Sequence, residues 1–110
     1  MTHRLAVLIS GTGSNLQAIL DAIDAGELPA RVSLVLSNKA GAAGLARAER
    51  AGVPAQAIDH RGFPDRASFD QAMIERIDAH GADTVVLAGF MRILSPGFVR
   101  HYQGRLINIH

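Results

Sequence analysis

The feature that most constrains the fold of this chain is the alternation of short apolar runs with stretches of helical periodicity. The first run, residues 5–9, is continuously apolar, which is typical of a strand buried on both faces of a parallel sheet. Apolar residues then recur at i, i+3, i+4 and i+7, which predicts an amphipathic helix that closes near Gly26. The residues of this stripe are Leu16, Ile19, Leu20 and Ile23.

The same alternation continues along the whole chain. Further strands are predicted at residues 32–36, 54–58, 84–88 and 105–110, and further helices at residues 44–51, at 65–79 with Asp65 or Ser68 as the cap, and after Ser95-Pro96. Strands separated by helices pair in parallel through right-handed crossovers. We therefore predict an α/β fold: a Rossmann-like, three-layer parallel sheet with helices on both faces, forming a single subdomain over residues 1–110. Because the sequence ends inside this last, largely apolar strand, we expect the sheet to be truncated.

The composition excludes several classes of function. The 110 residues carry 11 basic and 10 acidic side chains without a basic stripe, so no nucleic-acid partner is expected. The absence of cysteine excludes disulfides, thiolate metal sites and cysteine nucleophiles. No metal is expected either, because the histidines outside the last strand lack metal-ligand spacing: His3, His60, His80 and His101. Without an apolar run near the ~20 residues of a membrane span, and without a signal peptide, we expect a cytoplasmic protein with no membrane partner.

A glycine-rich loop, Ser-Gly-Thr-Gly-Ser-Asn at residues 10–15, lies between the first predicted strand and the first predicted helix. Glycines let the backbone turn tightly and approach a ligand closely. The helix start adds unpaired N–H groups and the positive end of the helix dipole, and Ser14 and Asn15 add side-chain donors. The loop therefore predicts a phosphate site. The alternative is a tight turn in which Ser14 serves only as a helix cap.

Two missing signals narrow the class of phosphate compound. Leu16 stands where a dinucleotide fingerprint has a third small residue, and the second predicted strand ends in Ser-Asn-Lys at residues 37–39 rather than in an acidic residue. No lysine followed by serine or threonine comes after the loop, so the triphosphate-binding pattern is missing too. The class of ligand that remains for this loop is a small monophosphate compound.

Two polar residues, Asn108 and His110, alternate with apolar ones in the last predicted strand. Side chains two residues apart share a face, so we expect them to project together while Ile107 and Ile109 turn to the opposite, packed face. Both lie toward the carboxyl end of the strand, the edge at which open α/β sheets bind ligands. An amide that donates to an oxyanion and an imidazole that transfers a proton suit acyl or formyl transfer.

Together these segments resemble the phosphoribosylglycinamide formyltransferase family. The matching blocks are VLISGTGSNLQAI at residues 7–19, LSNK at 36–39, VLAGFMRILS at 86–95 and LINIH at 106–110. The last two blocks are shared broadly with folate-dependent formyl-transferring enzymes. The first, with its Gly-x-Gly-Ser-Asn, points to the phosphoribosyl amine branch.

The resemblance implies transfer of a formyl group from 10-formyl-tetrahydrofolate to the amine of 5-phosphoribosylglycinamide in purine biosynthesis, without a metal. It implies that Asn108 stabilises the developing oxyanion and contacts the folate, and that His110 donates a proton. The implied substrate-binding residues are Gly13, Ser14, Asn15 and Gly89. The implied folate-binding residues are Arg66, Met91, Arg92, Ile93 and Leu94, although Arg66 also fits a solvated arginine at a helix start.

The family's third catalytic group, a downstream aspartate, and the rest of its folate pocket have no counterpart in these 110 residues. We therefore expect an N-terminal fragment that ends at the catalytic histidine, is inactive or nearly so alone, and has a complementary C-terminal fragment as a candidate partner. Two alternatives remain: a non-catalytic module that binds a phosphorylated ligand, and a formyltransferase for another amine. Asp59, at the predicted ligand edge, is a further candidate for binding.

Overall fold

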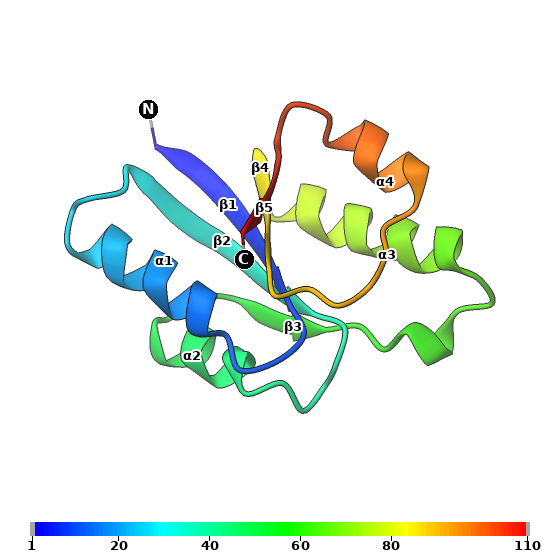
Figure 1. The fold of residues 1–110 in the computed structure, drawn as a ribbon, viewed down its shortest axis with the longest axis horizontal. Coiled ribbons are helices and arrows are strands. Elements are labelled where there is room, and N and C mark those ends of the chain that lie inside the picture. The colour runs from blue at the N-terminus through cyan, green and yellow to red at the C-terminus, as the bar shows by residue number, and fades with distance from the viewer. Residues whose placement is uncertain (1, 110) are drawn as a thin grey trace.

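The computed structural model of the chain describes residues 2–109, in which strands and helices alternate as the sequence predicts (Figure 1). The strands are β1 (His3–Ile9), β2 (Ala30–Ser37), β3 (Ala55–Ala57), β4 (Thr84–Ala88) and β5 (Leu106–Ile109). The helices are α1 (Ser14–Asp24), α2 (Gly44–Arg50), α3 (Arg66–Ala79) and α4 (Pro96–His101), with a 3-10 turn, η1 (His60–Gly62), before α3.

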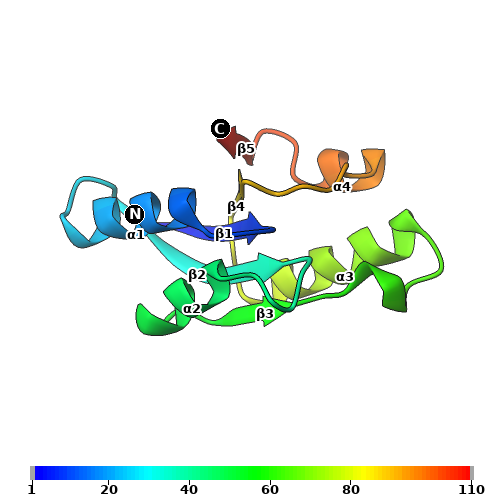
Figure 2. The ribbon, with the colours of Figure 1, turned by 60° about the horizontal axis from the view of Figure 1, so that its bottom comes forward.

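The strands form a sheet of order β3-β2-β1-β4-β5 in which every pair is parallel. Helices α1 and α2 cover one face and α3 and α4 cover the other (Figures 1 and 2). This three-layer arrangement confirms the predicted Rossmann-like fold. Because the strand order reverses at β1, the carboxyl ends of β1 and β4 lie next to each other, which is where open α/β sheets bind ligands.

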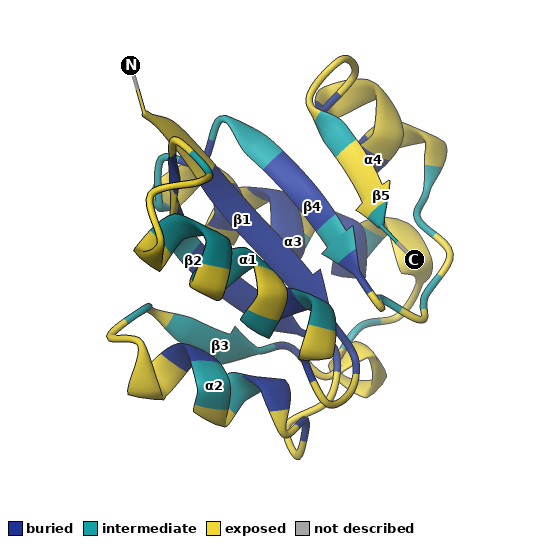
Figure 3. Ribbon diagram, turned by 60° about the vertical axis from the view of Figure 1, so that its left-hand side comes forward, coloured by how far each residue is buried: buried dark blue, intermediate teal, exposed yellow. Residues whose placement is uncertain are grey.

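Each face of the sheet has its own core. Leu8, Leu36 and Val85 pack under α3 and α4 with Phe69, and all four side chains are almost fully buried. On the opposite face, the apolar residues of β1 and β2 pack against α1 and α2, with Leu16 of α1 fully buried; Figure 3 shows β1 buried along most of its length. Burial on both faces explains why β1 and β2 read as continuous apolar runs rather than alternating ones.

The helix ends follow the predicted signals. The Asp65 carboxylate accepts the backbone N–H of Ser68 at 2.8 Å and caps α3, and the Ser95 hydroxyl accepts that of Phe98 at 3.3 Å at the start of α4. Gly26 and Gly52 follow α1 and α2 with φ of 75° and 73°, the left-handed conformation that ends many helices.

Two aspartates of α3 hold α4 in place. Asp70, 2% exposed, accepts the backbone N–H of Ser95 at 2.6 Å. Two turns further on, Asp78 accepts the Tyr102 hydroxyl at 2.9 Å and lies 2.7 Å from Nε2 of His101. Burial together with the bond to Asp78 raises the pKa of Tyr102 well above its usual range. His101 therefore contacts Asp78 as well as solvent, since its side chain is 42% exposed. No helix within residues 2–109 is long and apolar enough to cross a membrane.

Candidate functional site

The glycine loop turns the chain from β1 into α1 through Gly13, which is the N-cap of the helix. Its φ of 77° lies in the left-handed region, and no side-chain hydrogen bond caps the helix. Since the first intrahelical bond runs from Gln17 N–H to the Gly13 carbonyl at 2.8 Å, the preceding N–H groups of the first turn have no partner within the helix. The alternative in which Ser14 is a plain cap is wrong, because Ser14 is the first residue of α1 and makes no capping bond. Both the amides and the Ser14 hydroxyl are left for an anion.

The shape of this loop depends on contact with the start of α2. A Cβ built on Gly13 would lie 2.7 Å from the Cα of Gly44, and one built on Gly44 would lie 2.5 Å from Cδ1 of Ile9. Two hydrogen bonds fasten the contact: Gly44 N–H donates to the Gly11 carbonyl at 3.0 Å, and Arg47 Nε donates to the Thr12 carbonyl at 2.7 Å. The loop is therefore fixed by packing, and glycine at position 13 serves this close approach as well as the turn.

A cleft of about 290 Å³ opens at the carboxyl edge of β1 and β4. It is lined by Ser10, Gly11, Thr12, Gly13, Ser14, Asn15, Lys39, Ala88, Gly89 and Met91. The four substrate-binding residues implied by the resemblance are therefore brought together in one open space. Within residues 2–109 no packed side chain fills this cleft, so the described part of the chain leaves room for a ligand.

Lys39 is the one charged residue among those that line the cleft, and it is the only lysine of the chain. It follows β2, and its backbone is held by the Ser37 hydroxyl, which accepts its N–H at 3.0 Å and donates to its carbonyl at 2.8 Å. A lysine beside helix N–H groups makes the cleft suitable for a dianionic phosphate. The sequence reasoning did not include Lys39 in the site, although its place directly after a strand at the ligand edge was an available signal.

The segment after β4 presents its residues in two directions. Met91 and Ile93 project outward, 76% and 74% exposed, whereas Leu94 packs against the core under α3. The Arg92 guanidinium lies 4.9 Å from the centroid of the Phe69 ring, and the buried Arg92 Nε has no hydrogen-bond partner within the described residues. Of the folate-binding residues implied by the resemblance, Met91 alone lines the cleft.

Two of the other implied residues lie away from the cleft. Arg66 is exposed in the first turn of α3 and does not line the cleft. Asn108 pairs with Leu87 in the sheet, and Leu87 packs toward α3 and α4, so Asn108 turns to that face and is exposed. The structure therefore brings Asn108 to the ligand edge but not into the cleft lined by the glycine loop. His110 lies outside the described residues.

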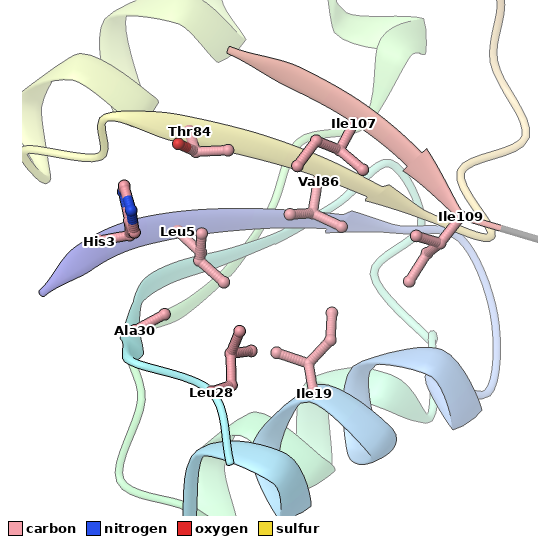
Figure 4. Close-up of a pocket in the computed structure, with 9 residues that line it drawn as sticks. All are labelled: His3, Leu5, Ile19, Leu28, Ala30, Thr84, Val86, Ile107 and Ile109. Carbon is pink, nitrogen blue, oxygen red and sulfur yellow. The ribbon is translucent and has the colours of Figure 1, made fainter. Parts of the chain in front are cut away.

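The face of β5 opposite Asn108 is not packed as predicted. Ile107 is 50% exposed, and Ile109 is partly buried. Both line an apolar hollow of about 320 Å³ between the sheet and α1, with Leu5, Val86 and Ile19 among its other walls (Figure 4). The prediction of a packed face was wrong for Ile107, because α1 lies over β1 and β2 and does not reach across to β5.

Asp59, the remaining candidate at this edge, binds its own neighbour instead. Its carboxylate accepts the backbone N–H of Arg61 at 2.9 Å and forms an ion pair with Nη2 of the same residue at 2.6 Å. These contacts lower the pKa of Asp59 from 3.8 to about 2. Asp59 does not line the cleft, and its carboxylate is already paired with Arg61. Within residues 2–109 no cluster of three metal-ligating side chains is found.

Comparison with known proteins agrees with this geometry. The family model described as "Formyl transferase" matches residues 3–110. Phosphoribosylglycinamide formyltransferase of Escherichia coli is 53% identical over 106 residues, which are 96% of this chain and 50% of that protein. The human trifunctional purine biosynthetic protein adenosine-3 is 50% identical over 107 residues, which are 97% of this chain and 11% of that protein.

Solved structures show the same arrangement. Glycinamide ribonucleotide transformylase 1 from Symbiobacterium toebii superposes with a TM-score of 0.96 at 48% identity, over 99% of this chain and 51% of that one. The phosphoribosylglycinamide formyltransferase of Coxiella burnetii in complex with CHES has a TM-score of 0.96 at 47% identity, over 100% of this chain and 52% of that one. The chain thus spans about half the length of these bacterial relatives. With a family model that matches nearly all of it, the chain belongs to the formyl transferase family.

Proposed function

We propose that this chain supplies the phosphate-binding side of an enzyme that transfers a formyl group from 10-formyl-tetrahydrofolate to the amine of 5-phosphoribosylglycinamide in purine biosynthesis. The observation that carries the proposal is the open cleft that is lined by the N-terminus of α1, including Ser14, together with Lys39. Relatives named for this substrate that are about half identical to this chain support it. The alternatives, a non-catalytic module and an enzyme for another amine, have no observation in their favour.

In this proposal the substrate phosphate lies on the N–H groups of Gly13, Ser14 and Asn15. Such N–H groups bind anions because they have no helical partner and carry the positive end of the helix dipole. Lys39 adds a full charge, and Gly89 leaves room at the opposite wall of the cleft. Residues 1–110 would form one subdomain whose task is to hold the substrate at its phosphate.

The folate is a co-substrate that supplies the formyl group. The exposed side chains of Met91 and Ile93 provide apolar surface beside the cleft, of the kind that a flat ring system needs. Attack of the substrate amine on the formyl carbon produces an oxyanion, to which the Asn108 amide would donate. The intermediate then collapses by breaking the bond between the formyl carbon and the folate nitrogen, and His110 would donate a proton so that tetrahydrofolate leaves as a neutral amine, while the attacking amine loses its proton. The roles of Arg66, Arg92 and Leu94 toward the folate, and the cytoplasmic location, remain predictions.

A formyl-transfer assay on the chain alone, and on the chain mixed with the C-terminal half of the E. coli relative, tests the activity. We expect turnover near background for the chain alone and restored turnover for the mixture. Asn108→Ala should lower the restored rate by on the order of 10²–10³, since an oxyanion donor is lost. Gln103→Ala, which removes another exposed amide before β5, should leave that rate unchanged.

Two outcomes would contradict this account. Turnover by the chain alone, at a rate comparable to that of a full-length relative, would contradict the predicted inactivity of the half. A mixture whose halves associate in gel filtration yet show no turnover would contradict the proposed reaction.

A further inference from the structure

Two buried polar side chains lie at the carboxyl ends of β1 and β2, and one of them, that of Ser10, belongs to a residue that lines the cleft. Ser10 is 4% exposed at the end of β1, and Asn38 is 6% exposed just after β2. The Ser10 hydroxyl donates to Oδ1 of Asn38 at 2.5 Å and accepts the backbone N–H of Met91 at 2.8 Å. Burial of a polar group costs free energy unless its hydrogen bonds are made, so this arrangement holds each partner in place.

The geometry of the hydroxyl makes the connection directional. A serine has one proton to donate, and here that proton goes to Asn38. A lone pair of the same oxygen then receives the Met91 amide. If the hydroxyl were removed, both the Asn38 carbonyl oxygen and the Met91 N–H would lose a partner in a region with little water, which is costly for each group.

Ser10 and Met91 belong to two parts of the cleft with different expected ligands. The phosphate of the substrate is expected at the glycine loop, and the folate is expected at segment 91–94. Ser10 is the first residue of the glycine loop, and Met91 begins segment 91–94, in which Met91 and Ile93 are exposed. They are 81 residues apart in the sequence. The chain between them turns through Gly89, at φ 75°, and segment 91–94 belongs to no helix or strand. Within the part of the chain that the structure describes, the Ser10–Met91 bond is the one hydrogen bond that joins the loop 10–15 to segment 91–94.

The hydrogen bonds of Ser10 and Asn38 also extend toward Lys39, the cation that lines the cleft. Asn38 is followed directly by Lys39, whose backbone is fixed by the hydroxyl of Ser37. The Ser10–Asn38 bond therefore ties together the ends of β1 and β2 as well as the segment after β4. One hydroxyl holds three strand ends in a single arrangement.

We propose that Ser10 is a positioning residue that couples the glycine loop, residues 10–15, to segment 91–94. A ligand bound at the loop would then change the environment of that segment as well. The identities of the two ligands rest on the proposed function, whereas the mechanical link is a property of the chain itself. In the transfer reaction, this link would keep the amine of the substrate and the formyl donor in one relative position.

Amide hydrogen exchange and a ligand titration on the ¹⁵N-labelled chain test this inference. In Ser10→Ala, the Met91 amide should exchange about tenfold faster, since the loss of a buried hydrogen bond has this effect on local opening. In the unsubstituted chain, 5-phosphoribosylglycinamide should shift the amides of residues 13–15 and also those of residues 92–94, which do not line the cleft themselves. In Ser10→Ala, the shifts at residues 13–15 should remain and those at residues 92–94 should disappear.

Two further variants separate positioning from a general loss of structure. Ser10→Thr keeps the hydroxyl and should restore both the Met91 protection and the shifts at residues 92–94. Ser33→Ala is the matched control: it removes a β2 hydroxyl that donates to the Leu5 carbonyl at 3.3 Å, and it should change neither readout. If Ser10→Ala does not give a folded spectrum, Ser10→Cys, which fills the same space but replaces the hydroxyl oxygen with a weakly accepting sulfur, is judged by the same two readouts.

The outcomes distinguish this inference from the proposed function. Unchanged Met91 exchange in Ser10→Ala, or shifts at residues 92–94 that persist in it, would overturn the coupling. Absence of any shift at residues 13–15 in the unsubstituted chain would instead count against the proposed function, and the exchange measurement would still decide whether Ser10 holds Met91.

Discussion

Two parts of the ligand edge, the glycine loop after the central strand β1 and the end of the outer strand β5, are built very differently. The loop is buried at Gly13, packed against Gly44 and hydrogen-bonded to Arg47. At the end of β5, Asn108 is exposed, and its neighbour Ile107 is half exposed over an apolar hollow. The described residues therefore fix the shape of the proposed phosphate site, whereas they leave the proposed oxyanion donor open to solvent. Binding of a phosphate compound without turnover is the behaviour that this contrast predicts for the chain alone.

The largest effect is expected from Gly13→Ala, which changes the packed glycine loop after β1. An added Cβ would meet the Gly44 backbone at 2.7 Å, in a conformation with φ 77° that side chains disfavour. We expect a loss of about 3 kcal/mol in the free energy of unfolding, from left-handed strain and overpacking together, and loss of phosphate binding. Urea denaturation and calorimetric titration measure the two effects.

Gly26→Ala is the matched control for that substitution. Gly26 has a similar φ of 75°, but an added Cβ would meet nothing within 4 Å. Its cost should be about 1 kcal/mol, from the conformational strain alone, with phosphate binding intact. Equal costs for the two substitutions would show that the contact with Gly44 does not fix the loop.

The second effect concerns the charge of the cleft. Lys39→Ala should weaken the affinity for 5-phosphoribosylglycinamide about tenfold, since one charge-assisted contact to a phosphate is lost. Arg31→Ala removes an exposed cation near the start of β2, at the opposite edge of the sheet, and should leave the affinity unchanged. If calorimetry at moderate salt gave the same affinity for both variants, Lys39 would have no part in the site.

The β5 end of the molecule depends on how α4 is held, and Tyr102→Phe probes this. Tyr102 is fully buried and donates to Asp78 at 2.9 Å. Loss of this bond should lower the free energy of unfolding by about 1 kcal/mol, with phosphate affinity retained. Thermal unfolding measures the change in stability, and calorimetry on the same sample measures the phosphate affinity. A large drop in phosphate affinity would show that the glycine loop and the β5 region are not independent.

The smallest effect belongs to a paired carboxylate at the same edge but outside the cleft. Arg61 lowers the pKa of Asp59 from 3.8 to about 2. Because the folded-state pKa is depressed, the small stabilisation is complete above pH 3.8 and is lost as the pH falls through about 2. Carboxyl NMR should find Asp59 titrating near pH 2 in the unsubstituted chain and closer to 3.8 in Arg61→Ala. Titration near 3.8 in both chains would show that the pair does not form in solution.

Much of the fold could be predicted because its signals are local. The apolar run ending at Ile9 and the caps Asp65 and Ser95 each act within a few residues, and the parallel topology follows from their order. The strand bounds differ modestly: β3 is shorter than predicted and β1 begins earlier, at His3, where pairing with β2 continues beyond the apolar run.

The parts of the site that could not be predicted depend on contacts between distant segments. The close approach of Gly44 to Gly13 and the bond from Met91 to Ser10 join residues that no spacing rule connects. Ile107 has the pattern of a packed strand residue, but the pattern cannot tell whether another element covers it. Lys39 could be recognised as a candidate from its place after a strand at the ligand edge, but only the arrangement of the loops shows that it lines the cleft.

A crystal structure of this chain with 5-phosphoribosylglycinamide would test the central claim most directly. The account predicts that the phosphate lies on the N–H groups of Gly13, Ser14 and Asn15, with the Lys39 ammonium group beside it. A phosphate bound elsewhere, with the cleft at the glycine loop empty, would contradict the account.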